Sequence, residues 1–173
     1  MVLLVAGIPG CVGIDAVPIL GADACEASRE AEVTSVRDGD TFEVEDGEAV
    51  RMLGVNSPEI AHDSTEVSEC FGDEAAAWAT ERLTELTVTL SFDTTCEDTY
   101  GRTLAYAWTT DEETLEEILL NEEIVELGYA RVYEDFDDIR LADRLYAAQD
   151  RAQATNAGLW AVCEDRKSTR LNS

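Results

Sequence analysis

Hydrophobic and polar positions alternate along much of this chain, at the period expected of half-buried β-strands. Residues 32–55 contain three such stretches, and the Asp46-Gly47 pair between the second and the third is a hairpin signal. The clearest alternation covers residues 86–92, where Leu, Val, Leu and Phe share one face and Thr, Thr and Ser share the other. A further strand is expected over residues 103–108. The pattern therefore predicts five strands, the first three arranged as a meander.

Three other segments carry apolar residues at helical spacing. The first covers residues 71–86. The second, over residues 119–130, is shorter, and Gly128 suits its C-terminal cap. The third is a longer helix over residues 137–160, with Gly158 marking its end.

The order of these elements indicates the fold class. Three strands, a helix, two strands and two helices, with the helices segregated from the strands, are typical of an α+β domain. We predict a five-stranded OB-fold β-barrel with three helices over residues 32–163, and barrels of this type commonly bind nucleic acids and sugars. Residues 26–31 look like a short acidic linker before this domain.

The charge of the chain lies far outside the usual range. It has 38 acidic and 12 basic residues, a formal net charge of −26, and Lys167 as its only lysine. Such a charge repels phosphates at ordinary ionic strength, but at molar salt the screening length falls to about 3 Å and close contacts survive. An acidic surface almost without lysine resembles the salt-adapted proteins of extreme halophiles. An acidic protein from ordinary salinity is the alternative.

The two ends of the chain differ from the rest in composition. No charge precedes Asp15, and this apolar run is too short for a comfortable membrane span but suits the core of a secretory signal. The segment Ile8–Cys11 is a weak lipobox-like pattern, so residues 1–25 are expected to be a signal or lipoprotein-like segment with Cys11 as a lipid site. A buried N-terminal strand is the alternative. Residues 164–173 form a tail whose last eight residues resemble a translated vector sequence.

The cysteines are compatible with disulfides if the protein is exported, either secreted or lipid-anchored on the outer face of the membrane. If Cys11 is lipidated or removed, Cys25, Cys70, Cys96 and Cys163 remain, and four cysteines permit three pairings. None of the spacings is Cys-x-x-Cys, so a zinc site is not expected.

Two groups of residues with candidate chemistry lie at predicted strand ends or in adjoining loops, where a rigid barrel can position them. Their members are Asp38, Asp40, Arg51, Asn56 and Glu59 in the first group, and Asp98, Tyr100 and Arg102 in the second. A phosphodiester hydrolase needs oxygen ligands for a hard cation, a carboxylate near the attacking water, and guanidinium groups for the phosphate oxygens. Spacing alone does not show that these residues converge.

Each residue also has a plainer interpretation. Asp38 and Asp40 can simply shape a turn, as Asp-Gly sequences do. Arg51 can pair with one of the many surface acids, Glu59 can be an ordinary loop acid, and Tyr100 can pack against a hairpin.

Four segments together resemble the staphylococcal nuclease (thermonuclease) family: VRDGDTFEVEDGEAVRMLGVNSPE, ECFGDEA, EDTYGRTLAY and ELGYARVY…GLW. They run in order from about Val33 to Trp160, and their combination is far more specific than any one part. The resemblance implies an OB-fold barrel with three helices. It also implies a calcium-dependent nuclease that cleaves single-stranded or fraying DNA and RNA and leaves 3′-phosphate ends. We expect a monomer.

The resemblance further implies a calcium site in this sequence. Asp40 would be a ligand at the end of the Asp-Gly-Asp turn, and Ser57 would offer its backbone carbonyl. Asn56 stands where the family usually places a second ligand Asp. Asn can offer its side-chain carbonyl but removes one negative charge, so we expect weaker calcium binding.

The same resemblance implies the residues that act on the phosphate. Glu59 would be the general base, and Arg51 and Arg102 would bind the scissile phosphate and stabilise the transition state. The supporting residues on the substrate side would be Asp38, Asp98 and Tyr100.

The family fold should bring the loop before the first helix close to the loop before the Tyr-Gly-Arg turn. The resemblance therefore implies a Cys70–Cys96 disulfide. A Cys25–Cys163 disulfide would then tie the two ends of the domain together.

Two other functions compete with an exported, salt-adapted nuclease. One is a non-catalytic nucleic-acid-binding module on the same barrel, like the degenerate repeats of the Tudor staphylococcal nuclease proteins. Asn56 favours it, whereas the retention of Arg51, Glu59 and Arg102 together disfavours it. The other is a structural or adhesion module of an acidic cell surface, which leaves this set of arginines unexplained.

Overall fold

A computed structural model describes Cys25 and residues 28–133 and 139–163. The predicted signal segment up to residue 24, the lipid site at Cys11 and the tail over residues 164–173 lie outside the described part of the chain, so they stay predictions. Within the described part, no helix is both long enough and apolar enough to cross a membrane.

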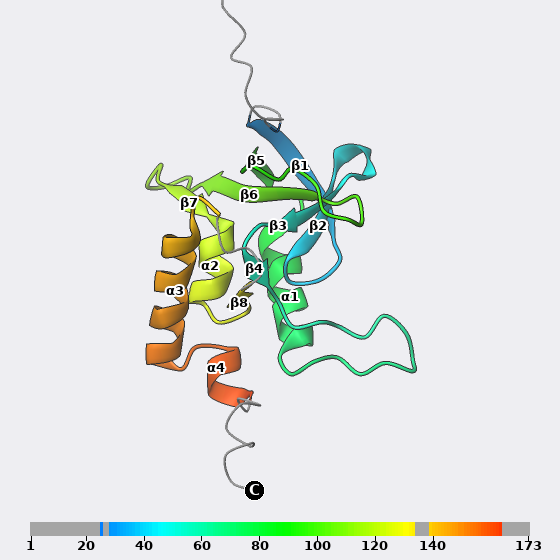
Figure 1. Ribbon diagram of the computed structural model, residues 1–173, viewed down its shortest axis with the longest axis vertical. Coiled ribbons are helices and arrows are strands. Elements are labelled where there is room, and N and C mark those ends of the chain that lie inside the picture. Colours follow the sequence, from blue (N-terminus) through cyan, green and yellow to red (C-terminus); the bar gives the residue numbers. More distant parts are fainter. Residues whose placement is uncertain (1–24, 26–27, 134–138, 164–173) are drawn as a thin grey trace, which may run out of the picture.

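Five strands close into a mixed β-barrel, which confirms the predicted fold class (Figure 1). Neighbouring strands run antiparallel in the order β3-β2-β1-β5-β6, and a parallel pairing of β3 with β6 joins the two edges. Closing the sheet in this way leaves these strands without an open edge. The strands are β1 (Arg29–Val36), β2 (Thr41–Val44), β3 (Ala49–Met52), β5 (Thr87–Ser91) and β6 (Thr103–Thr110).

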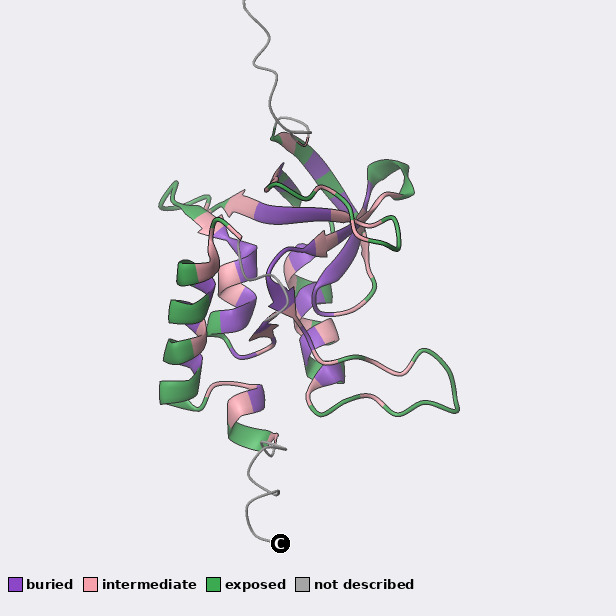
Figure 2. Ribbon diagram, viewed as in Figure 1, coloured by how far each residue is buried: buried purple, intermediate pink, exposed green. Residues whose placement is uncertain are grey.

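The alternation in the sequence becomes the inner and outer faces of the barrel (Figure 2). In β5, Val88 and Leu90 are buried, whereas Thr87 and Thr89 are exposed. The hydrophobic core fills the barrel and continues into the helices, for example at Leu145 of the third predicted helix. The apolar faces of the strands and helices therefore build one large core, and a second, smaller cluster consists of Leu53, Leu104, Tyr106 and Leu119.

The first strand begins earlier than predicted. Arg29 of β1 pairs with Leu90 of β5, and Ala31 is buried in the barrel core. Residues 29–31 are therefore strand and not linker.

The helices cover the barrel from two sides. In Figure 1, α1 lies below the barrel, and α2 and α3 lie side by side next to it. A short fourth helix, α4, ends the described chain at the opposite end of the domain from the start of β1. The helices are α1 (Gly72–Leu83), α2 (Leu120–Glu126), α3 (Ala142–Thr155) and α4 (Leu159–Val162).

The long helix predicted over residues 137–160 is wrong in its extent, because α3 and α4 are separate. Asn156 adopts a left-handed conformation with φ of 52°, which ends α3. Gly158, with φ of +51°, then passes so close to Gly128 that a Cβ there would lie 2.3 Å from the Gly128 carbonyl oxygen. A glycine is needed at this crossing, so the helical spacing cannot continue through it.

Three short strands escaped the sequence analysis because they have two or three residues each, too few to show a period. The predicted third strand turns at Gly54, with φ of +77°, and resumes as β4. In the antiparallel pair of β4 and β8, Asn56 lies opposite Arg131. The short strands are β4 (Val55–Asn56), β7 (Glu117–Leu119) and β8 (Arg131–Val132).

The disulfides join Cys25 to Cys96 and Cys70 to Cys163. The predicted Cys70–Cys96 and Cys25–Cys163 pairings are therefore wrong, although all four cysteines do form disulfides. The antiparallel pairing of β1 with β5 carries Cys25, just before β1, to the loop after β5, where Cys96 lies. The second disulfide links the residues just before α1 to the end of α4.

Candidate active site

Asp40 lies at the centre of the first group of candidate residues, immediately before β2. It is only 4% exposed. Its Oδ2 accepts a hydrogen bond from the Ser57 N–H at 2.7 Å, and its Oδ1 accepts one from the Thr41 hydroxyl at 3.0 Å. Arg51 Nη1 forms an ion pair with Oδ1. The Asp40 carboxylate therefore joins the Asp-Gly-Asp turn to β3 and to the loop after β4.

Local backbone geometry explains why the Asp-Gly-Asp turn, β3 and the loop after β4 lie close together. Thr41 pairs with Arg51 across the β2–β3 ladder, so Arg51 emerges beside the turn. Gly39 lets Ser57 approach from the other side, because a Cβ on Gly39 would lie 2.6 Å from Ser57 Cβ. The sequence analysis missed the roles of Gly39 and Thr41, although the Asp-Gly-Asp-Thr run contains both.

Arg51 is held by buried Asp40 and part-buried Asn56 and not by a surface acid. Its side chain is 12% exposed, and its Nη2 donates a hydrogen bond to Asn56 Oδ1 at 3.2 Å. Its Nη1 lies against Asp40 as an ion pair but makes no hydrogen bond of good geometry. Asp40 and Asn56 together therefore fix the orientation of the Arg51 guanidinium group.

Asn56 and Ser57 stand next to Asp40 as the resemblance implies, but both are already engaged. The Asn56 amide oxygen, the atom expected to ligate calcium, accepts the hydrogen bond from Arg51. Ser57 is 2% exposed and contacts Asp40 through its N–H, whereas the expected ligand atom was its carbonyl oxygen.

Within the first group of candidate residues, Asp38 has a clearly raised pKa. Burial first, and then the negative charge of Asp40, raise the pKa of Asp38 from 3.8 to about 6. Glu59 adds a smaller repulsion, and the hydrogen bond from the Asp40 N–H at 3.0 Å opposes the rise. Negative charge is therefore concentrated where Asp38, Asp40 and Glu59 approach one another.

Asp38→Asn should stabilise the protein in the absence of divalent cations. Asn keeps an acceptor for the Asp40 N–H but removes the repelled charge. Because the folded-state pKa is raised, the charged form of Asp38 destabilises the fold at pH 8, and the penalty fades as the pH falls from 6 to below 4. We expect a gain of about 1–2 kcal/mol at pH 8 after discounting for partial solvent exposure, and none at pH 3.5. Denaturant unfolding at both pH values in chelator measures it, and a gain independent of pH would contradict this origin.

The donor chemistry of the first group fits a hard cation. Asp38, Asp40, Asn56 and Ser57 offer carboxylate, amide and backbone oxygens, the ligand types that Ca²⁺ prefers. Among the described residues, no group of three or more His, Cys, Asp or Glu side chains could hold a metal ion. A cation here would therefore depend on the amide and backbone oxygens and on water. Burial and the neighbouring charge of Asp40 both raise the pKa of Asp38, and a cation would offset the second of these causes.

The second group forms a compact turn around Asp98. Asp98 Oδ1 accepts hydrogen bonds from the N–H groups of Tyr100 at 2.8 Å and Arg102 at 3.0 Å, and Oδ2 accepts one from Arg102 Nε at 2.7 Å. Burial alone would raise the pKa of Asp98, but the Arg102 and Tyr100 hydrogen bonds lower it overall. Gly101 provides the positive φ of +80° that the turn requires. Asp98 therefore orients the guanidinium group of Arg102.

Tyr100 is 84% exposed, so it is not a packing residue of a hairpin. The guanidinium carbon of Arg102 lies 5.4 Å from the centre of its ring. The pair presents an aromatic face and a cation together at the surface, in contact with solvent.

Glu59 is exposed, but its backbone is fixed by the start of α1. Its carbonyl oxygen accepts a hydrogen bond from the Glu69 N–H at 2.8 Å, and its N–H donates to Glu69 Oε2 at 3.3 Å. A Cβ on Gly72 would lie 2.4 Å from the Glu59 carbonyl oxygen, so the helix passes directly against this residue. Within the described residues the Glu59 carboxylate makes no hydrogen bond or ion pair, and it repels the charge of Asp38.

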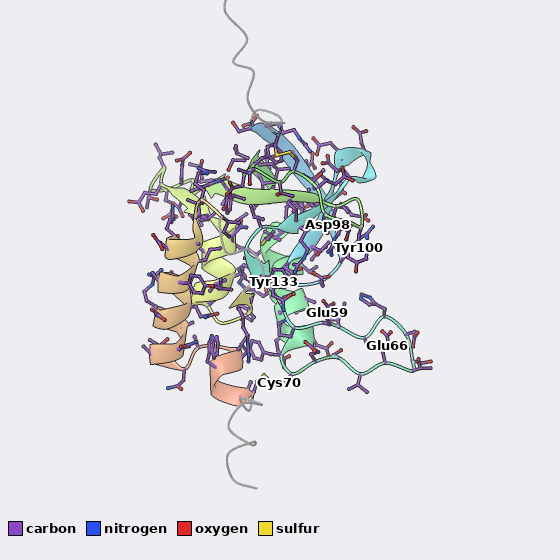
Figure 3. All side chains as sticks on the ribbon, in the orientation of Figure 1. Glu59, Glu66, Cys70, Asp98, Tyr100 and Tyr133 are labelled. Atoms are coloured by element: carbon purple, nitrogen blue, oxygen red, sulfur yellow. A yellow bond between two sulfur atoms is a disulfide. The ribbon has the colours of Figure 1, made fainter. Side chains whose placement is uncertain are left out.

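The two groups lie on the same side of the domain in Figure 3, where Glu59, Asp98 and Tyr100 are labelled. The parallel β3–β6 pairing sets Arg51 opposite Leu104, two residues after Arg102. Among the hydrogen bonds and ion pairs described for residues 28–133, none joins one group directly to the other. The structure thus brings Asp38, Asp40, Arg51 and Asn56 of the first group together, leaves the Glu59 carboxylate exposed nearby, and places the second group on the adjacent strand end.

Comparison with known proteins identifies the family. Residues 49–162 match the family described as staphylococcal nuclease homologue. The chain is 33% identical over 148 residues to the thermonuclease of Staphylococcus hyicus, a match covering 83% of each chain. It is 35% identical over 133 residues to the thermonuclease of Staphylococcus intermedius, covering 74% of each. An uncharacterized protein of Methanocaldococcus jannaschii is 34% identical over 148 residues, 74% of this chain and 70% of that protein. The chain therefore belongs to the staphylococcal nuclease homologue family.

Proposed function

We propose that this chain is an exported calcium-dependent nuclease that hydrolyses phosphodiester bonds of DNA and RNA to 3′-phosphate products at high salt. That it is a nuclease of the phosphodiesterase class follows from its family. The observation that best supports the finer proposal is the contact of buried Asp40 with Arg51, next to Asn56 and Ser57. An arginine that a carboxylate and an amide oxygen hold in one orientation can present its remaining N–H groups to a phosphate oxygen.

The residues present can carry hydrolysis in one displacement. Arg51 and Arg102 bind the phosphate oxygens and stabilise the charge that grows on them in the transition state. Glu59 accepts a proton from the attacking water as its oxygen bonds to phosphorus. The P–O5′ bond breaks and the departing 5′-oxygen takes a proton from solvent water, to which Glu59 then returns its own proton, leaving a 3′-phosphate and a 5′-hydroxyl.

The calcium that the family implies would be held by Asp40, Asn56 and Ser57, with Asp38 nearby. When bound, a hard cation supplies Lewis-acid polarisation of the phosphoryl group. Asp40 Oδ1 is at present shared by Arg51 and Thr41.

High salt is part of the proposal because of the net charge of −26. Salt must shorten the electrostatic screening length to about 3 Å before a polyanion can approach this acidic chain closely. Arg51 and Arg102 bind phosphate through short contacts, which this screening leaves largely intact.

The two disulfides and the thermonuclease relatives support an extracellular site of action. We propose that the protein acts outside the cell, as a monomer that is either released or held by lipid at Cys11. Mass spectrometry of Cys11 in the membrane fraction distinguishes the two forms.

A non-catalytic binding module on the same barrel is the second candidate. Asn56 favours it, because this position offers no negative charge for a cation and its oxygen already accepts a hydrogen bond from Arg51.

The deciding experiment is cleavage of single-stranded DNA and RNA by the full chain in about 2–3 M KCl, where the Debye length is near its short limit. Calcium-dependent cleavage, lost in chelator, supports the nuclease. Folded protein that binds the strands but does not cut them in excess calcium supports the binding module.

Asn56→Asp should tighten calcium binding by about tenfold, because the site gains a full negative charge. Calorimetric titration at fixed salt measures the affinity, and the calcium-dependent rise in unfolding temperature measures it independently. Asn156→Asp is the matched control, since it adds the same charge at the exposed end of α3. If Asn56→Asp and Asn156→Asp bind calcium equally well, residue 56 is not a ligand.

A further inference from the structure

The loop that carries Arg102 is thinly packed against the rest of the domain. Most residues from Thr94 to Gly101 are exposed. The base of the loop, at Phe92 and Cys96, lines a hollow of about 410 Å³ together with Arg29 of β1 and Glu48. Side-chain packing therefore restrains this loop less than it restrains the barrel strands.

Short backbone contacts connect Cys96 to Arg102 within the loop. The Cys96 carbonyl oxygen accepts a hydrogen bond from the Leu104 N–H at 2.8 Å. Glu97 pairs with Thr103 in an isolated bridge, and the Asp98 N–H donates to the Arg102 carbonyl oxygen at 3.0 Å. A displacement of Cys96 is thus transmitted to the turn in which Asp98 orients Arg102.

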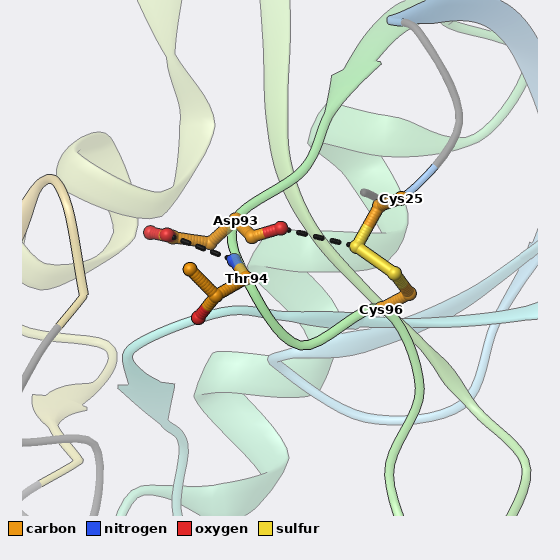
Figure 4. Close-up of a disulfide and its surroundings, with 4 residues drawn as sticks. All are labelled: Cys25, Asp93, Thr94 and Cys96. Carbon is orange, nitrogen blue, oxygen red and sulfur yellow. Dashed lines mark hydrogen bonds between the residues drawn. A yellow bond between two sulfur atoms is a disulfide. The ribbon is translucent and has the colours of Figure 1, made fainter. Parts of the chain in front are cut away.

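The Cys25–Cys96 disulfide fixes this base covalently (Figure 4). Cys25 precedes β1, so the bond ties the loop to a strand in the middle of the barrel sheet. Cys25 Sγ also lies 3.0 Å from the carbonyl oxygen of Asp93, at the other end of the loop. A disulfide sulfur has no hydrogen to donate, so this is a close contact and not a hydrogen bond. Both ends of the loop base therefore face the same disulfide.

We propose that the Cys25–Cys96 disulfide positions Arg102 for phosphate binding, in addition to any effect on global stability. The proposal rests on the proposed nuclease function. A purely structural disulfide acts on the unfolded chain and changes the folded fraction without changing the rate of folded molecules. A positioning disulfide lowers kcat of the folded protein, because small misplacements of a transition-state contact are costly.

The test compares matched pairs of serine substitutions in the full chain, below the unfolding transition. Cys25→Ser with Cys96→Ser should lower kcat by about 10–30-fold, with KM changed less than about threefold. Cys70→Ser with Cys163→Ser is the control. The two bonds span separations of 71 and 93 residues, so the chain-entropy account predicts nearly equal losses of stability. The control should keep kcat within about threefold, since two hydrogen bonds to Glu69 and the close approach of Gly72 hold the Glu59 backbone without that disulfide.

A double-mutant cycle shows whether the effect passes through Arg102. In an Arg102→Ala background, removing the Cys25–Cys96 disulfide should change kcat by less than about twofold. An undiminished loss in that background would overturn the proposal. So would equal losses of kcat in the two disulfide variants.

Hydrogen exchange keeps this inference separate from the nuclease proposal. If the wild-type chain does not cleave, the nuclease proposal fails, but exchange of the Arg102 and Leu104 amides still reports the position of the loop. Removing the Cys25–Cys96 disulfide should accelerate that exchange by about tenfold or more relative to the barrel amides. Unchanged exchange would overturn the inference whether or not the wild-type protein cleaves.

Discussion

Arg102→Ala should lower kcat/KM for single-stranded DNA by about 10³–10⁵-fold, the loss typical of an arginine that stabilises a phosphoryl-transfer transition state. Asp98 holds the Nε of Arg102 at 2.7 Å, which leaves the terminal nitrogens to meet the phosphate. The side chain is 28% exposed, so its ion pair with Asp98 adds at most about 1 kcal/mol to stability. Arg102→Ala should therefore lower the rate of cleavage and leave the stability of the fold nearly unchanged.

Two further variants show which property of Arg102 matters. Arg102→Lys keeps the charge but loses the planar fork, so it should recover less than a tenth of the lost activity. Arg151→Ala removes an equally charged group from α3, where the side chain is 47% exposed and pairs with Glu126. It should keep activity within about twofold, because it lies away from the site. Arg102→Ala activity within tenfold of wild type would remove Arg102 from the proposed mechanism.

The barrel could be predicted because alternation over a full strand determines which side chains face inward. β5 shows this, since buried Val88 and Leu90 alternate with exposed Thr87 and Thr89. The hairpin was likewise predictable from Asp46-Gly47, and both residues adopt positive φ, at 73° and 76°. Such signals are local in the sequence. They predict the structure correctly when the local preference of the turn agrees with the packing of the core.

The features that were mispredicted depend on contacts between distant segments. The disulfide pairing follows from the register of β1 against β5, which no cysteine spacing records. The end of α3 follows from the close crossing of Gly158 over Gly128. Gly158, near the end of the helical pattern, predicted a stop. Only its close approach to the Gly128 backbone explains why the chain begins a separate helix there.

The candidate site divides in the same way. Asp40 and Arg51 meet because Thr41 pairs with Arg51 in the β2–β3 hairpin, a register that the spacing of the residues did not show. The hydrogen bond that Arg51 donates to Asn56 could not be predicted, because it depends on β4, a strand of two residues. The sequence therefore supplied the identity of the groups, and the tertiary fold supplied their contacts.

Glu59→Gln should lower kcat by about 10²–10⁴-fold, the usual contribution of a positioned general base. Gln has the same shape and cannot accept the proton of water. The backbone of Glu59 would stay in place, because its carbonyl oxygen and its N–H bond to Glu69 and its carbonyl lies against Gly72. The midpoint of denaturant unfolding should therefore match that of the wild-type protein within about 0.5 kcal/mol.

Glu66→Gln is the matched control for this substitution. Glu66 lies on the exposed loop after Glu59 and accepts a hydrogen bond from the His62 N–H, which a Gln oxygen can also accept. It should keep kcat within about twofold, so a large loss there would indicate a general effect of loop charge. If Glu59→Gln cuts as fast as wild type, another base activates the water. If neither wild type nor Asn56→Asp cuts, although both bind the strands, the missing charge at position 56 is not the cause and the barrel is a binding module.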